Sequence, residues 1–144
     1  MRILVSACLL GCSCRYDGQS KPCGQILSLS SRHCLIPVCP EQLGGLPTPR
    51  PPAEIQGDKV ISNQGADVTA AYQKGAREAL LLYEVLGCEL AILKSRSPSC
   101  GCGQVYDGSF SGTLREGDGV TAALLQSRGL PLLTEEQEAE LSQL

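Results

Sequence analysis

Aromatic side chains and histidine are scarce in this chain of 144 residues, which has no tryptophan, one phenylalanine, four tyrosines and one histidine. Because His33 is the only histidine, a metal centre built from several histidines is excluded. No apolar run approaches the roughly 18 to 20 residues of a membrane-spanning helix, so we expect no membrane span. The length fits one compact domain, which we predict to cover residues 1–144.

The chain also lacks the excess of basic residues found in proteins that bind polymeric nucleic acid. It has 12 basic and 15 acidic residues, a net charge of −3, and four of the acids lie within the last eleven residues. We therefore expect no nucleic-acid polymer as a partner. Residues 1–52 nevertheless contain five basic and two acidic residues, which is enough to hold a small anion.

Two motifs that would indicate other chemistry are absent. The chain has no CxxC pair, which counts against a zinc site built from such pairs and against a thioredoxin-like redox role. It also has no Gly-Lys-Ser/Thr phosphate-binding loop. This second absence weakens the hypothesis of an ATP-dependent thiolation protein, because thiolation normally needs an activated oxygen leaving group.

Cysteine, in contrast, is abundant, with nine residues in the chain. They form about 6% of the sequence, below the roughly 8 to 10% typical of disulfide-bonded scaffolds, and their number is odd. The first apolar run, residues 3–10, is short and leads into small residues and cysteines, unlike a secretory signal peptide. We therefore predict a cytoplasmic protein whose cysteines are reduced and partly bound to metal.

Apolar runs suited to buried strands alternate with segments of helical spacing. The predicted strands of the main sheet cover residues 3–5, 35–38, 90–93 and 130–133. Five prolines within residues 39–53 predict a long loop without regular structure. We also expect a short hairpin strand at residues 60–62 and a turn-rich segment around Tyr106 and Phe110.

Helical spacing is clearest from Asp67, the expected N-cap, to Leu86, after which Gly87 ends the pattern. Three shorter helical segments are predicted at residues 25–32, at residues 118–127 with Asp118 as the cap, and from Thr134 onward. Strands that alternate with helices predict an α/β fold with a mostly parallel, Rossmann-like sheet flanked by helices.

Three cysteines follow three of the predicted strands. Cys8 comes after the first strand, Cys39 after the second, and Cys100 in the loop after the third. Because ligands of open parallel sheets bind beyond the carboxyl ends of the strands, we expect these thiols to meet there. Thiolates suit zinc or an iron–sulfur cluster, and three of them leave one ligand position open where four would close a structural site.

Three blocks of sequence around these cysteines resemble a known family. They are SACLLG followed by RYDG within residues 6–18, PVCPE followed by GGL and PR within residues 37–50, and KSRSPSCG followed by YDG and GDGV within residues 94–120. Together they resemble the small bacterial thiouracil desulfidases, a family formerly classed as a domain of unknown function. The resemblance covers nearly the whole chain.

This resemblance implies a [4Fe–4S] cluster held by Cys8, Cys39 and Cys100, with one iron free of protein ligands. It implies an enzyme that removes sulfur from a thiolated pyrimidine, either thiouracil or thiouridine monophosphate, without net redox change. The products would be the oxo pyrimidine and hydrogen sulfide, as in a hydrolase. Six cysteines have no role in this motif: Cys12, Cys14, Cys23, Cys34, Cys88 and Cys102.

Candidate catalytic residues lie beside the motif cysteines. Glu41, two residues after Cys39, is well placed to direct water at the carbon that loses sulfur, and we predict that it is the general base. A turn cap or an ion pair with Arg50 is its alternative role. Ser97 and Ser99 precede the third cysteine, and we expect Ser97 to donate or relay a proton and Ser99 to contact substrate. Hydrogen bonds to the loop backbone are the alternative.

Further residues are candidates for substrate binding. Lys94 and Arg96 would stabilise negative charge on the cluster or on a nucleotide phosphate, the alternative being solvated loop charges. Tyr16 and Phe110 lie in glycine-rich loops where a base could stack, although structural packing is an equal possibility.

Two local features admit simpler readings. We expect Arg15 and Asp17 to pair with each other and hold the first cysteine loop closed. Residues 117–119 open a predicted helix and could cradle a phosphate, but a plain turn is favoured.

Two other classes of function remain open. One is a structural module that binds zinc or an iron–sulfur cluster without turnover, and the other is a sulfur-transfer or thiolation protein. The colour of the protein separates zinc from a cluster, and sulfide release separates an enzyme from a module. The sequence contains no pattern that specifies an oligomeric state.

Overall fold

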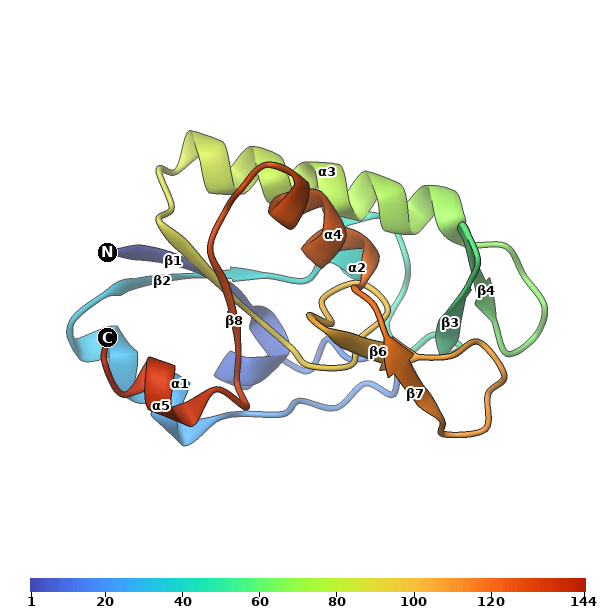
Figure 1. Cartoon of the computed structure of the whole chain (residues 1–144), viewed down its shortest axis with the longest axis horizontal. Coiled ribbons are helices and arrows are strands. Elements are labelled where there is room, and N and C mark those ends of the chain that lie inside the picture. Colours follow the sequence, from blue (N-terminus) through green and yellow to red (C-terminus); the bar gives the residue numbers. More distant parts are fainter.

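A four-stranded parallel sheet in the order β2-β1-β5-β8 forms the centre of the computed structural model, which describes all 144 residues (Figure 1). Its strands are β1 (Arg2–Ser6), β2 (Cys34–Val38), β5 (Leu90–Leu93) and β8 (Leu132–Thr134). All three neighbouring pairs are parallel. The predicted α/β class and the four predicted strands are thus confirmed.

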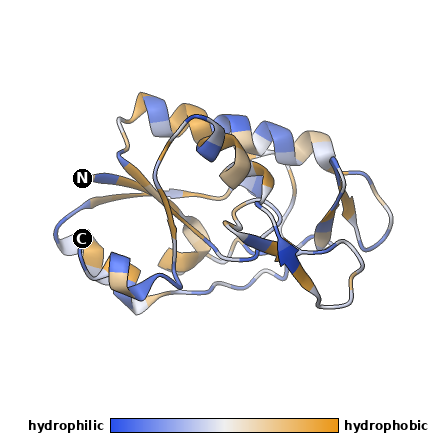
Figure 2. Ribbon diagram, viewed as in Figure 1, coloured by the Kyte–Doolittle hydropathy of each residue, from blue (hydrophilic) through white to orange (hydrophobic).

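Helices cover both faces of this sheet (Figure 1). On one face lie α1 (Gly24–Ser28) and α5 (Glu138–Leu141), and on the other lie α3 (Thr69–Val85) and α4 (Val120–Ser127). Figure 2 shows the apolar strands in the centre and helices of mixed hydropathy around them. Burial on both faces explains why the central strands are continuous apolar runs instead of alternating patterns.

The alternation of side chains along the strands divides the core between the two faces. Ile3 and Val5 of β1 pack into the apolar core on the face that α1 and α5 cover. Leu4 packs into the core on the opposite face, which α3 and α4 cover. Short 3-10 turns continue the chain after β1 and α1, at Ala7–Leu10 and Leu29–Ser31. None of the helices is both long and apolar enough to cross a membrane.

Two antiparallel hairpins lie beside the sheet. One consists of β3 (Ala53–Gln56) and β4 (Lys59–Ser62), which confirms the predicted hairpin strand. The other consists of β6 (Gln104–Tyr106) and β7 (Leu114–Glu116), where we predicted only turns. Three-residue strands in which only Val105 is buried are too short to show an alternating pattern.

The predicted loop after β2 contains a helix, so the prediction that residues 39–53 lack regular structure was wrong. The helix is α2 (Pro40–Leu43), and Pro40 occupies its first turn. Proline is tolerated at that position because the backbone N–H it lacks would have no partner within the helix.

Predicted helix caps were displaced by one residue in two places. Val68 is the N-cap of α3, although the Asp67 carboxylate still accepts the N–H of Thr69 at 3.0 Å. Gly119 is the N-cap of α4, and Asp118 instead accepts the N–H of Gly103 at 2.8 Å. Asp67 therefore stabilises the turn before its helix, whereas Asp118 ties the start of α4 to the segment before β6.

Helices α2 and α3 meet with their backbones in direct contact. A Cβ atom added to Gly75 would lie 1.9 Å from the Pro40 carbonyl oxygen, and one added to Gly44 would lie 2.0 Å from the Ala71 carbonyl oxygen. Only glycine permits so close an approach. This contact fixes α2, and with it Glu41, on the longest helix of the protein.

We expect the Gly75→Ala variant to lose roughly 1 to 3 kcal/mol of unfolding free energy, because the new methyl group must push the helices apart. The matched control is Gly24→Ala, also in a helix but with no atom within 4 Å of the added Cβ. That control should be neutral or stabilising by up to about 1 kcal/mol. Urea unfolding followed by far-ultraviolet circular dichroism measures both, and equal midpoints for the two variants would contradict the close-contact argument.

Candidate active site

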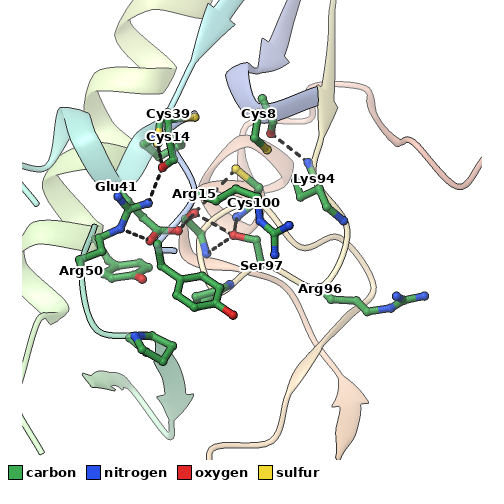
Figure 3. Close-up of a pocket in the computed structure, with 18 of the residues that line it drawn as sticks. Cys8, Cys14, Arg15, Cys39, Glu41, Arg50, Lys94, Arg96, Ser97 and Cys100 are labelled. Atoms are coloured by element: carbon green, nitrogen blue, oxygen red, sulfur yellow. Dashed lines mark hydrogen bonds and ion pairs between the residues drawn. The ribbon is translucent and has the colours of Figure 1, made fainter. Parts of the chain in front are cut away.

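A cavity of about 650 Å³ opens beyond the carboxyl ends of β1, β2 and β5 (Figure 3). Strand β2 lies beside one edge of β1, and β5 lies beside the other edge. The direction in which successive strands are added to the sheet therefore reverses between β1 and β5. Ligands of open α/β sheets bind at such a reversal. The two hairpins supply further walls, through Ala53, Tyr106 and Phe110 among others.

Cys8, Cys39 and Cys100 line this cavity, each coming from a different strand end (Figure 3). Cys8 lies in the 3-10 turn after β1, Cys39 is the N-cap of α2, and Cys100 lies in the loop after β5. The expected convergence at the edge of the sheet is therefore observed. A fourth cysteine, Cys14, also lines the cavity and is 6% exposed.

The remaining five cysteines do not line the cavity. Cys88 is buried in the part of the core that α3 covers. The thiol of Cys102 accepts a hydrogen bond from Gln126 Nε2 at 3.1 Å. Cys12 and Cys34 are exposed and Cys23 is half-buried.

The arrangement of the thiols fits a cluster better than a single metal ion. No group of three histidine, cysteine, aspartate or glutamate side chains is placed to hold a single metal ion, although the Cys14 thiol forms hydrogen bonds with the thiols of both Cys8 and Cys39. Each cysteine that holds a [4Fe–4S] cluster binds a different iron, so its ligands stand around a larger space. Three thiols spread around one cavity meet that requirement.

Burial and mutual hydrogen bonding favour the protonated thiols. Burial raises the pKa of Cys100 to about 12, despite opposing hydrogen bonds with Ser6 and Ser99. The hydrogen bond with Cys14, followed by burial, raises the pKa of Cys39. Iron must therefore displace protons when it binds, since thiolates are the ligands.

Arg50 connects the segments that carry the cysteines. Its Nε donates to Glu41 Oε1 at 2.9 Å, and the two side chains are 4% and 12% exposed. Its Nη2 donates to the Cys14 carbonyl oxygen at 2.9 Å, and its Nη1 donates to the Pro47 carbonyl oxygen and to Thr48 Oγ1. The ion pair that we held as the alternative role of Glu41 is present. The central position of Arg50 was missed, although the Pro-Arg pair in the second block marked it.

A chain of hydroxyl groups leads from the cavity to the second oxygen of Glu41. Ser99 Oγ donates to Glu41 Oε2 at 2.9 Å, and Ser97 Oγ lies 3.0 Å from Ser99 Oγ. Ser99 is 1% exposed, whereas Ser97 is only half-buried and also accepts the N–H groups of Ser99 and Cys100 at 3.1 Å. Ser97 is thus the cavity end of the chain, and Ser99 is the bridge.

Helix α4 supports the serine loop from behind. The N–H of Val120 donates to the Pro98 carbonyl oxygen, and the N–H of Thr121 donates to the Ser99 carbonyl oxygen. A Cβ atom on Gly119 would lie 2.5 Å from that carbonyl, so the approach requires glycine. Residues 117–119 therefore form a structural turn, as favoured, and the helix terminus is occupied by protein carbonyls.

The two basic residues predicted to bind substrate also lie at the cavity. Lys94 and Arg96 line it but form ion pairs with Glu135 and Glu136. Hydrogen bonds from Lys94 and Ser95 outweigh burial and lower the pKa of Glu135.

Tyr16 and Phe110 also line the cavity and are partly exposed, at 40% and 38%. The expected pair of Arg15 with Asp17 was wrong, because Asp17 instead accepts the N–H of Gln19 at 3.0 Å and stabilises its own turn.

Comparisons with known proteins agree with the family resemblance seen in the sequence. Residues 3–137 match the family described as 2-thiouracil desulfurase. A solved structure of the [4Fe–4S]-dependent thiouracil desulfidase TudS is 48% identical and superposes with a TM-score of 0.92, over 98% of this chain and 95% of that one.

A second relative is YbbK of Bacillus subtilis (strain 168), a protein described as uncharacterized. It is 41% identical over 145 residues, which span 94% of this chain and 96% of YbbK. Since both the family match and this identity extend over nearly the whole length, the chain belongs to the 2-thiouracil desulfurase family.

Proposed function

We propose that this protein is a hydrolytic desulfidase, which replaces the sulfur of a thiolated pyrimidine by oxygen from water. Thiouracil desulfidation is the activity of its family. The observation that carries the proposal is the presence, in one cavity, of three thiols from three strand ends and of a hydrogen-bonded chain that ends on Glu41. We further propose that the protein works in the reducing cytoplasm, because its nine cysteines are all free thiols.

Cys8, Cys39 and Cys100 would hold a [4Fe–4S] cluster. When bound through three cysteines, such a cluster supplies one iron without a protein ligand, a thiophilic Lewis acid that polarises the C=S bond and takes up sulfide. The overall reaction consumes one water, whose oxygen forms the new C=O bond. Its two protons leave with the sulfide, so no oxidant or reductant is needed.

The protein must therefore accept a proton from water and return protons to the departing groups. Ser97 faces the cavity, and its hydroxyl is the group that accepts the proton of the attacking water and passes one on to Ser99. Ser99 passes a proton to Glu41, the general base of the relay. Arg50 keeps the Glu41 carboxylate oriented and offsets its charge when no proton is bound.

The pyrimidine ring would lie between the cysteines and the partly exposed aromatic side chains. Tyr16 and Phe110 are the surfaces on which we propose that the ring stacks. Lys94 and Arg96 stand at the same cavity, where their ion pairs with acidic partners moderate the charge that they offer to substrate.

Sulfide release decides between this function and its two rivals. The cluster would be reconstituted under anaerobic conditions, and the protein incubated with 2-thiouracil, 4-thiouracil and thiouridine monophosphate. A desulfidase yields hydrogen sulfide and an equal amount of the oxo compound. A structural module or a thiolation protein with an intact cluster releases no sulfide, and that result would overturn the proposal.

Serine in place of Cys8, Cys39 or Cys100 should abolish the broad visible absorption of the reconstituted cluster, because thiolate is the iron ligand. Cys88→Ser is the control for a buried thiol and should keep the spectrum, since Cys88 lies in the core below α3. Cys14→Ser should also keep it. Should Cys14 prove necessary while one of the three tolerates serine, the ligand assignment must change.

Glu41→Gln should lower kcat by about 10² to 10⁴ at full cluster occupancy, because the amide keeps the shape of the side chain and can accept the hydrogen bond from Arg50 but has lost the basicity. Its free energy of unfolding should also fall, because Arg50 stays buried without its counter-charge. Glu54→Gln is the matched control from the same cavity. Glu54 accepts the N–H of Gly108 at 2.9 Å, a bond that an amide oxygen preserves, so its rate should stay within a few-fold.

Ser97→Ala tests the relay without breaking the ion pair with Arg50. It should also lower kcat at full cluster occupancy. Near-normal sulfide release by both Glu41→Gln and Ser97→Ala would place the base elsewhere.

A further inference from the structure

Four thiols meet at the cavity, one more than the three that we assign to the cluster. Cys14 is the fourth, and its side chain forms hydrogen bonds with the thiols of both Cys8 and Cys39. Its backbone is fixed as well, because its N–H donates to the Cys12 carbonyl oxygen and its carbonyl oxygen accepts Arg50 Nη2, each at 2.9 Å. Cys14 therefore stands beside two proposed ligands, although the proposed reaction gives it no task.

Of these two neighbours, Cys39 makes more contacts with Cys14. Besides the contact between the two thiols, Cys39 Sγ donates to the Cys14 carbonyl oxygen at 3.7 Å (Figure 3). Cys39 is itself held at the N-cap of α2, where its carbonyl oxygen accepts the N–H of Leu43 at 3.0 Å. A disulfide forms only between cysteines that lie close together. This pair meets that requirement with both backbones held in place.

Cys39 is also the proposed ligand that an oxidant reaches most easily. It is half-buried, whereas Cys8 and Cys100 are 8% and 4% exposed. The thiolate is the form of cysteine that peroxides oxidise, and a cysteine that has just lost its iron is in that form. Without a partner thiol, such a cysteine is open to further oxidation to the sulfinic acid, which is irreversible under ordinary conditions.

We propose that Cys14 is the resolving cysteine of Cys39, and that the two form a reversible disulfide when a peroxide destroys the cluster. The Cys39 thiolate attacks hydrogen peroxide and breaks its O–O bond, so that Cys39 becomes a sulfenic acid and hydroxide leaves. Cys14 transfers its proton to that hydroxide and attacks the Cys39 sulfur, which forms the S–S bond and releases a second hydroxide, protonated from solvent. In total the two sulfurs lose two electrons, and the peroxide is reduced to two waters.

The disulfide keeps the site available for a new cluster. Simple thiols reduce a disulfide, whereas they do not reduce a sulfinic acid. The bond from Arg50 to the Cys14 carbonyl oxygen involves the backbone alone, so it holds Cys14 in place in either state of the thiol. This inference rests on the proposed cluster ligands for its purpose, while the disulfide itself belongs to the cluster-free protein.

Mass spectrometry of the cluster-free protein tests the pairing. The reduced protein would be treated with one equivalent of hydrogen peroxide, its remaining thiols blocked, and its tryptic peptides fragmented. Two of the nine thiols should disappear together, with the loss of two hydrogen atoms and a link between Cys14 and Cys39. Cys12→Ser and Cys34→Ser, which each remove an exposed thiol from one of the same two tryptic peptides, should form the same link. A link from Cys14 to Cys8, or one between other cysteines, would overturn the proposal.

Recovery from oxidation gives a second measurement. After peroxide and then dithiothreitol, the unaltered protein should regain all nine thiols and, on reconstitution, the full visible absorption of the cluster. Cys14→Ser, which we expect to hold a cluster before oxidation, should instead accumulate sulfinic acid at Cys39 and lose most of that absorption. Equal recovery by the two proteins would contradict the protective role. The disulfide forms whether or not a thiopyrimidine releases sulfide, so its failure is distinct from failure of the proposed function.

Discussion

The buried ion pair between Arg50 and Glu41 is the interaction on which the geometry of the site depends. An uncompensated charge at so little exposure costs about 3 to 5 kcal/mol, so neither partner can move away from the other. The remaining donors of Arg50 bind the Cys14 carbonyl oxygen and the proline loop. One guanidinium thus joins the segment after β1, the helix after β2 and the loop that follows, and places a cysteine wall and a carboxylate around the same space.

Backbone contacts hold the loop that carries Ser97 and Ser99 in place behind the cavity. Helix α4 directs its first N–H groups at the loop that carries Ser97 and Ser99, and glycine at position 119 lets the two backbones touch. The hydroxyl chain to Glu41 is therefore held at both of its ends. A polar network of this kind keeps a single geometry because each of its groups has a partner.

The main sheet and the meeting of the three cysteines could be predicted from the sequence because both follow from local patterns. Strands buried on two faces are plain apolar runs, and parallel strands bring their ends to one edge. The helix α2, the second hairpin and the central position of Arg50 were missed. These features depend on contacts between distant segments, such as Gly75 against Pro40 or Arg50 against Cys14, which leave no periodic signal. The pairing of Lys94 with Glu135 likewise joins residues 41 positions apart.

The glycine contact between α2 and α3 has a mechanical consequence. Cys39 and Glu41 stand on either side of Pro40, and the Pro40 carbonyl rests against the backbone of α3 at Gly75. Any change that pushes α3 toward α2 at Gly75 would bear directly on the Pro40 carbonyl. Because Cys39 and Glu41 are the immediate neighbours of Pro40, such a change on the far side of α3 would reach a cluster thiol and the carboxylate at once.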